Sequence, residues 1–62
     1  MPKFQIEVQT SKQTHWFRTE WPESAEMLAK AFINQPDVMF VQILDNKAEK
    51  FTFTWSPSLG VR

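Results

Sequence analysis

The sequence predicts a small α+β domain of element order ββαββ, in which a four-stranded sheet carries one helix across one face. Apolar and polar residues alternate near both ends of the chain, which is typical of half-buried strands. A proline-initiated segment between them has the apolar spacing of a helix. The chain has 62 residues, so it has room for a single core.

The first strand is predicted over residues 3–9, where every second side chain is apolar. A period of two places these side chains on one face of a sheet. The polar residues 10–13 then predict a turn. The inward set of this strand is Phe4, Ile6 and Val8.

The second strand is predicted over residues 14–20, and its inward face has to be chosen. One choice buries the charged side chains of Arg18 and Glu20, and burying unpaired charge costs free energy. We therefore expect the opposite face to point inward. That inward set is His15, Phe17, Thr19 and Trp21.

A helix is predicted from Pro22 to Asn34, because proline is favoured in a first helical turn. Thr19 or Ser24 is expected to cap it, and Pro36 favours its end, since proline disfavours helical geometry in the preceding residue. The apolar stripe follows the helical period. It consists of Ala25, Leu28, Ala29, Phe32 and Ile33.

The second hairpin is predicted to join strands at 38–44 and about 48–55 through a turn at 45–47, since Asp-Asn favours turns. A loop of odd length points Met39, Val41 and Ile43 to the same side as the aromatic residues of the last strand. The opposite register would bury Gln42, so we prefer the first. The inward aromatic set is Phe51, Phe53 and Trp55, and Phe40 and Leu44 then face outward.

Two hairpins flanking a helix in 62 residues resemble, in element order alone, the β-grasp domain of bacterial immunoglobulin-binding proteins. The resemblance implies the strand order 2-1-4-3, with strands one and four parallel in the middle. An all-antiparallel order 2-1-3-4 is the alternative. We expect residues 1–55 to form the domain and residues 56–62, which lack periodicity, to form a mobile tail.

No catalytic, metal or cofactor site is expected. The chain has no cysteine, one histidine (His15) and one glycine (Gly60), which excludes a four-ligand zinc site of Cys and His and a glycine-rich phosphate loop. Glu20, Glu23 and Glu26 gather near the helix start, where carboxylates favour the helix dipole. We therefore expect a protein that is not an enzyme.

The outer face of the sheet is the predicted partner-binding surface, because Trp, Phe and Arg are enriched at binding hot spots. We expect a protein-interaction module, an adaptor or inhibitor, that binds another protein or forms a homodimer through this face or through strands two and three as open edges. Small proteins of this build resemble bacteriophage inhibitors of host enzymes. The predicted site is Trp16, Arg18, Phe40, Gln42, Leu44, Lys50 and Thr52.

Single-stranded nucleic acid is the alternative partner, with Trp16 and Phe40 stacking on bases and Arg18, Lys3 and Lys50 contacting phosphates. The net charge of zero and the lack of a basic stripe argue against duplex binding. The longest apolar run is residues 38–41, too short to span a membrane. An alternating pattern in place of a signal peptide leads us to expect a cytoplasmic location.

Overall fold

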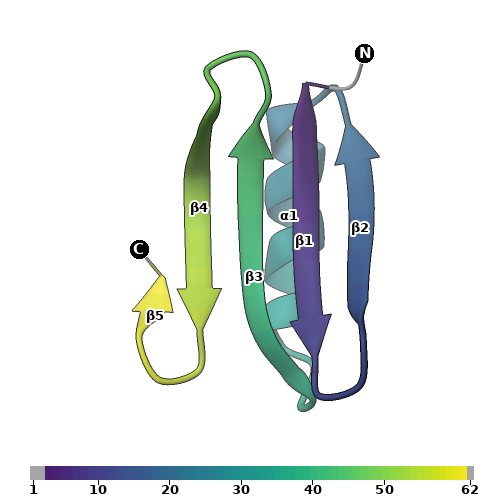
Figure 1. The fold of residues 1–62 in the computed structure, drawn as a ribbon, viewed down its shortest axis with the longest axis vertical. Coiled ribbons are helices and arrows are strands. Elements are labelled where there is room, and N and C mark those ends of the chain that lie inside the picture. Colours follow the sequence, from purple (N-terminus) through teal and green to yellow (C-terminus); the bar gives the residue numbers. More distant parts are fainter. Residues whose placement is uncertain (1–2, 62) are drawn as a thin grey trace.

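The computed structural model describes residues 3–61, which form one helix packed on one face of a five-stranded antiparallel sheet (Figure 1). Residues 1, 2 and 62 belong to the predicted domain and tail but lie outside the described residues. The small α+β class and the ββαββ order are confirmed, and a short fifth strand follows them. The elements are β1 (Phe4–Thr10), β2 (Thr14–Thr19), α1 (Pro22–Ile33), β3 (Val38–Asp45), β4 (Lys50–Ser56) and β5 (Gly60–Val61).

The strand order is β2-β1-β3-β4-β5, with every neighbouring pair antiparallel. The predicted β-grasp order 2-1-4-3 is therefore wrong, and the alternative 2-1-3-4 holds for the first four strands. Side-chain size gives a physical reason. The aliphatic side chains of β3 fit in the centre of the sheet beneath the small helix residues Ala25 and Ala29, whereas the bulkier Phe53 and Trp55 of β4 lie at the periphery of the core.

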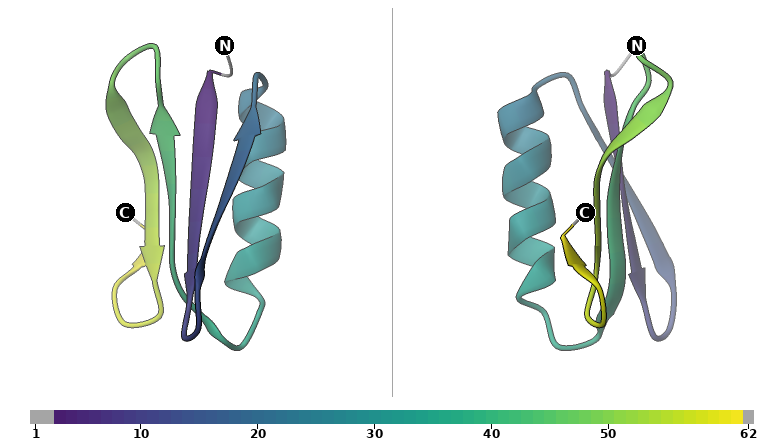
Figure 2. Two further views of the ribbon diagram at one scale, coloured as in Figure 1. Left: turned by 45° about the vertical axis from the view of Figure 1, so that its right-hand side comes forward. Right: turned by 90° about the vertical axis from the view of Figure 1, so that its left-hand side faces the viewer.

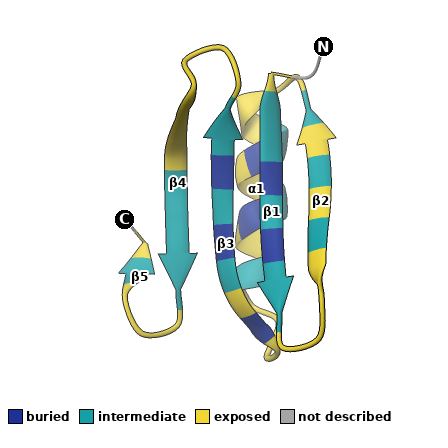
Figure 3. Cartoon of the chain, in the orientation of Figure 1, coloured by how far each residue is buried: buried dark blue, intermediate teal, exposed yellow. Residues whose placement is uncertain are grey.

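The core lies between α1 and the strands β1, β2 and β3, and Phe53 and Trp55 of β4 pack against its side (Figures 2 and 3). Two alanines on α1 allow the helix backbone to approach the sheet closely. The Phe17 ring of β2 packs against the Phe32 ring of α1, with 5.2 Å between centroids. Among the described residues, the buried apolar side chains are Ile6, Val8, Ala25, Ala29, Val38, Val41 and Ile43.

A bulge between β1 and β3 exchanges the faces of two adjacent residues. Gln9 lies opposite Phe40, but Thr10 lies opposite Val38, so Met39 is the extra residue. Val38 is 3% exposed and Met39 is 54% exposed. The prediction that Met39 points inward is wrong, because one inserted residue reverses the alternation beyond it.

A second irregularity lies where β3 pairs with β4. The connecting turn is residues 46–49 rather than 45–47, and Asp45 lies opposite Lys50. Asp45 Oδ1 accepts hydrogen bonds from the backbone N–H groups of Lys47 (3.0 Å) and Ala48 (3.1 Å). Leu44 then lies opposite Phe51 and Ile43 opposite Phe53, so Thr52 is an extra residue in β4. After this extra residue Phe53 points inward with Ile43.

The helix starts at Pro22 as predicted, with Trp21 as its N-cap residue and no side-chain capping hydrogen bond. The predicted caps at Thr19 and Ser24 are therefore wrong. The Oγ1 atom of Thr19 instead accepts a hydrogen bond from the Trp21 backbone N–H (3.2 Å). Trp21 is 64% exposed, so its predicted inward position is also wrong, because β2 ends at Thr19.

The C-terminal segment contains a strand that the sequence does not predict. Trp55 lies opposite Val61 and Ser56 opposite Gly60, which makes β5 an edge of the sheet. Gly60 has a φ of 72°, a conformation that glycine adopts without steric cost. The Oγ atom of Ser56 accepts a hydrogen bond from the backbone N–H of Leu59 (3.2 Å), which supports the turn.

Candidate interaction surface

One face of the sheet has no covering element among residues 3–61. The helix lies entirely on the opposite face, as the edge-on view shows (Figure 2). We call the uncovered side the outer face. It faces the viewer in Figure 1, where its dimensions correspond to the two longest extents of the molecule, 30 and 20 Å.

Side chains on the outer face form three rows across the strands, because residues directly opposite one another point to the same side. The central row contains Trp16, Glu7, Gln42 and Thr54. A second row contains Arg18, Gln5, Leu44 and Phe51. The third row contains Thr14, Gln9 and Phe40.

The middle of the outer face is a hydrogen-bonded polar cluster centred on Glu7. Its Oε1 atom accepts a hydrogen bond from Gln42 Nε2 on the neighbouring strand. Its Oε2 atom accepts a hydrogen bond from Gln9 Nε2 (3.2 Å). Both carboxylate oxygens are therefore bonded within the sheet, which fixes the positions of the two glutamine side chains.

Large apolar side chains flank this cluster on both sides. Trp16 on β2 is 56% exposed, and Phe51 on β4 is 55% exposed. Phe40 and Leu44 on β3 are half-buried. Burying such exposed side chains against a partner contributes roughly 25 cal/mol for each Å² of apolar surface removed from water. The outer face therefore combines apolar flanks with a preorganised polar centre.

Five of the seven predicted partner-binding residues lie together on this face: Trp16, Arg18, Phe40, Gln42 and Leu44. Thr52 is the extra residue of the β4 bulge and has no opposite partner. Lys50 lies opposite Asp45, which in turn lies opposite the inward-facing Phe4. The expectation that Lys50 belongs to the outer face is therefore wrong.

Phe51 is a residue of the outer face that sequence reasoning missed. Uninterrupted alternation along β4 predicts it inward with Phe53, but the register places it beside Leu44 on the outer face. A bulge of this kind reverses the faces of all residues on one side of it. No local pattern in the sequence marks this bulge, and the predicted three-residue turn at 45–47 also differs from the four-residue turn at 46–49 that the structure contains.

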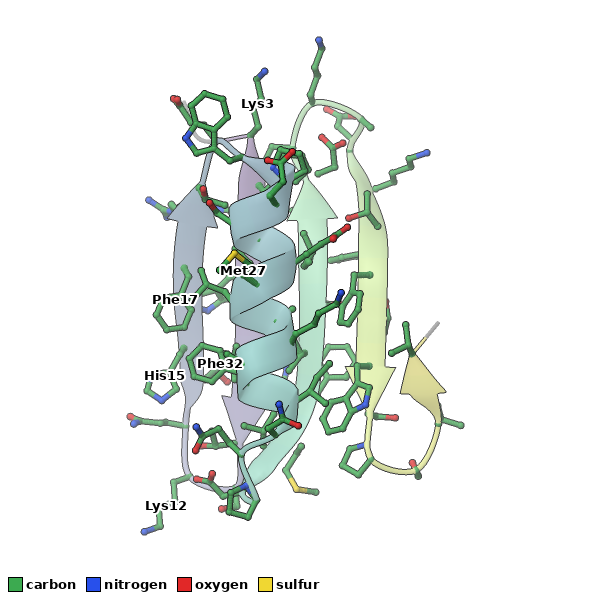
Figure 4. The ribbon with its side chains drawn as sticks, turned by 180° about the vertical axis from the view of Figure 1, so that it is seen from behind. Lys3, Lys12, His15, Phe17, Met27 and Phe32 are labelled. Atoms are coloured by element: carbon green, nitrogen blue, oxygen red, sulfur yellow. The ribbon has the colours of Figure 1, made fainter. Side chains whose placement is uncertain are left out.

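The outer face carries few charges among the described residues. Arg18 and Glu7 are the charged members of the three rows. Lys3 precedes β1 at one end of the sheet, where its backbone carbonyl accepts a hydrogen bond from the Asn46 N–H (2.8 Å; Figure 4). Arg18 lies on the outer face, whereas Lys50 lies on the opposite one. The cations predicted to contact nucleic acid, Arg18, Lys3 and Lys50, are therefore not on one face.

The single histidine lies on the helix side of β2. The His15 ring is 6.4 Å from the Phe17 ring, centroid to centroid, and Phe17 contacts Phe32 (Figure 4). The three rings pack side by side along the gap between β2 and α1.

Residues 3–61 contain no group of three or more His, Cys, Asp or Glu side chains positioned to hold a metal ion.

The helix presents a shallow apolar area on its solvent side. Its lining residues, Ser24, Met27, Leu28 and Ala31, all come from α1. Met27 is 72% exposed and lies toward β2 (Figure 4). Since one helix supplies every lining residue, this area is a patch of surface rather than a binding cavity.

The sheet edges differ from the predicted ones, because β3 lies inside the sheet. Among the described strands the edges are β2 and β5, and β5 covers only Trp55 and Ser56 of β4. The remainder of β4 has no paired strand on that side. This open stretch contains the Thr52 bulge and Lys50, two features that discourage strand addition.

Within residues 3–61, no helix has both the length and the apolar character required to cross a lipid bilayer. Comparison of the chain with protein-family models, with curated protein sequences and with solved structures gives no match.

Proposed function

We propose that this protein is a non-enzymatic interaction module, an adaptor or inhibitor, that binds another protein chain through the outer face of its sheet. The observation that carries the proposal is the exposure of Trp16 and Phe51 on the same uncovered face. A monomer gains nothing from showing two aromatic rings to water. Their burial by a partner removes that apolar surface from solvent.

The residue types on the outer face are those of protein interfaces. Trp and Arg are enriched among residues that lose 2 kcal/mol or more of binding free energy on truncation to alanine. Trp16 and Arg18 lie on the same face of β2, two positions apart. The cluster of Glu7 with Gln9 and Gln42 adds polar groups in fixed positions, and such groups favour specific binding over non-specific association.

The face is a better candidate than the edges. The open part of β4 contains a bulge and a lysine, and β2 is only six residues long with Arg18 near its end. Short edge strands, charges and bulges are the devices by which proteins prevent strand addition. Binding by side chains of the outer face requires no backbone pairing at these edges.

Single-stranded nucleic acid remains the second candidate, and the arrangement of charge favours it less. Stacking on Trp16 would bring a phosphate backbone near one cation, Arg18, and near the Glu7 carboxylate in the same pair of strands. Nucleic acid binding depends on several positive groups that displace counterions. Titration of a fluorescent oligonucleotide at two salt concentrations tests this candidate, and salt-sensitive binding at low salt would favour it over the proposal.

The proposal is tested by affinity capture with two matched tryptophan variants. Trp16→Ala removes an exposed ring from the outer face. Trp21→Ala removes a ring of somewhat greater exposure at the helix N-cap, where the side chain makes no capping hydrogen bond. We expect Trp16→Ala to lose the captured protein and Trp21→Ala to retain it. Equal capture by both variants would contradict binding through the outer face.

A further inference from the structure

We infer that the chain binding the outer face is a second copy of this chain, in a symmetric dimer whose two-fold axis runs parallel to the strands between β1 and β3. The inference rests on the proposed function, because it names the partner of the same surface. The area of the face, the distribution of its charges and the positions of its aromatic rings support this dimer.

The area of the outer face suits a copy of itself. Extents of 30 and 20 Å give a projected area of about 600 Å², close to the roughly 800 Å² of accessible surface that each partner buries in a standard interface. A second copy has a face of the same dimensions, so it covers all four apolar side chains at once. A chain of 62 residues also benefits from a second subunit, because a core of this size supplies little stability.

The charges of the outer face permit contact with a copy. The face carries one cation, Arg18, and one carboxylate, Glu7, so it has no net charge to repel its twin. The Glu7 carboxylate already accepts hydrogen bonds from Gln9 and Gln42. It can therefore be covered by a partner without leaving an unbonded buried charge.

The carboxylate also selects the direction of the two-fold axis. Two sheets that pack face to face lie about 10 Å apart with their strands nearly aligned. An axis across the strands through the central row stacks Glu7 on Glu7 of the second copy. An axis along the strands between β1 and β3 instead places Glu7 against Gln42 of the second copy, since these residues are opposite one another across the axis. Repulsion between the two Glu7 carboxylates disfavours the first arrangement, so the axis along the strands is preferred.

This axis makes the two exposed rings, Trp16 of one copy and Phe51 of the other, diagonal neighbours across the interface. It places β2 of each copy over β4 of the other, so Trp16 lies over Thr54 of the second copy and Arg18 lies over Phe51. The rings of Trp16 and Phe51 are then one row apart, about 7 Å along the strands. Within one chain, β1 and β3 separate β2 from β4, a distance of about 14 Å at the usual strand spacing. Contact between these two rings therefore requires two chains.

The first test measures the dimer dissociation constant by sedimentation equilibrium for the full chain and its variants. We expect the wild type to dimerise and Trp16→Ala to weaken dimerisation by about 30-fold or more, whereas Trp21→Ala leaves it unchanged. Far-UV circular dichroism of each variant establishes that the fold is retained. A wild type that stays monomeric at millimolar concentration would overturn the inference.

A charge variant keeps the test decisive if Trp16→Ala perturbs folding. Gln5→Lys adds a cation to the outer face at a partly exposed position, and Met27→Lys adds one to the solvent side of α1. We expect dimerisation to weaken at least tenfold in Gln5→Lys and to stay unchanged in Met27→Lys, because only the first charge is buried between copies. Equal effects of the two variants would contradict a dimer formed through the outer face.

The axis is tested by a double-mutant cycle between Trp16→Ala and Phe51→Ala. Residues more than about 10 Å apart in one chain contribute independently. Each single variant is expected to raise the dimer dissociation constant. We expect the rise in the double variant to be at least about threefold smaller than the product of the two single rises, and this shortfall reports contact between copies. Independent effects would overturn the proposed axis.

These outcomes distinguish the dimer from the broader proposal. A monomeric wild type whose captured protein is lost in Trp16→Ala would overturn the dimer and support the binding of a different protein. A dimer that Trp16→Ala leaves intact would overturn the inference and place self-association on another surface.

Discussion

Trp16 and Phe51 lie on the same face of the sheet, on strands separated by β1 and β3, and each residue exposes more than half of its surface. Their common face depends on the bulge at Thr52, which turns Phe51 away from the core. Without the bulge, alternation would place Phe51 with Phe53 on the helix side. The apolar character of the outer face is thus partly a product of this one inserted residue.

The bulge between β1 and β3 predicts opposite sensitivities for two adjacent residues. Val38→Ala is expected to lower the free energy of unfolding by about 2 kcal/mol, because it removes buried methyl groups. Met39→Ala is expected to change it by less than about 0.5 kcal/mol, since Met39 is mostly exposed. Urea denaturation of both variants checks this, and a larger loss for Met39→Ala would contradict the bulge.

The Glu7 cluster predicts a cost for removing its carboxylate. Glu7→Ala is expected to lower the free energy of unfolding by about 1–2 kcal/mol, because the amides of Gln9 and Gln42 lose their acceptors. Gln5→Ala is the matched control, since Gln5 lies on the same strand and face but outside the cluster. Equal stability of the two variants, measured by urea denaturation, would show that the cluster contributes nothing.

The turn before β4 predicts a difference between two substitutions of Asp45. Asp45→Ala is expected to cost about 1 kcal/mol of stability, because the backbone N–H groups of Lys47 and Ala48 lose a side-chain acceptor. Asp45→Asn retains an acceptor oxygen and is expected to stay within about 0.5 kcal/mol of the wild type. Thermal unfolding distinguishes them, and an equally large loss in both variants would contradict a turn held by this oxygen.

The fifth strand predicts a local effect of substituting Gly60. A Cβ added at this position meets no atom within 4 Å, but the φ of 72° disfavours any residue with a side chain. Gly60→Ala is therefore expected to weaken β5 by about 1 kcal/mol through backbone strain alone. Amide hydrogen exchange should accelerate at Val61 and Trp55 and stay unchanged in β1. Unaltered exchange at Val61 would contradict the left-handed turn.

Much of the fold follows from local patterns in the sequence. The alternation of Phe4, Ile6 and Val8 predicts β1, and the cost of burying Arg18 correctly sets the faces of β2 from His15 to Thr19. The stripe of Ala25 and Ala29 correctly predicts the buried side of α1. These features depend on neighbouring residues only, which is why a single sequence is sufficient.

The strand order and the bulges depend on contacts between distant segments. The alternation in β1 is equally compatible with β3 or β4 as its neighbour, so the sequence left both orders open. The inserted residues Met39 and Thr52 have no local signature, yet each reverses the face of its neighbours. The prediction that Trp16 and Gln42 lie on the outer face is correct. Phe51 and Lys50 were assigned to the wrong faces: Phe51 lies on the outer face and Lys50 on the inner one.

Side-chain NMR of the two exposed tryptophans during dilution tests the binding surface most directly. Self-association through the outer face predicts that the indole N–H signal of Trp16 shifts with protein concentration while that of Trp21 stays constant. A Trp16 signal that does not move between micromolar and millimolar protein, or a Trp21 signal that moves instead, would contradict the assignment of the outer face as the site of self-association.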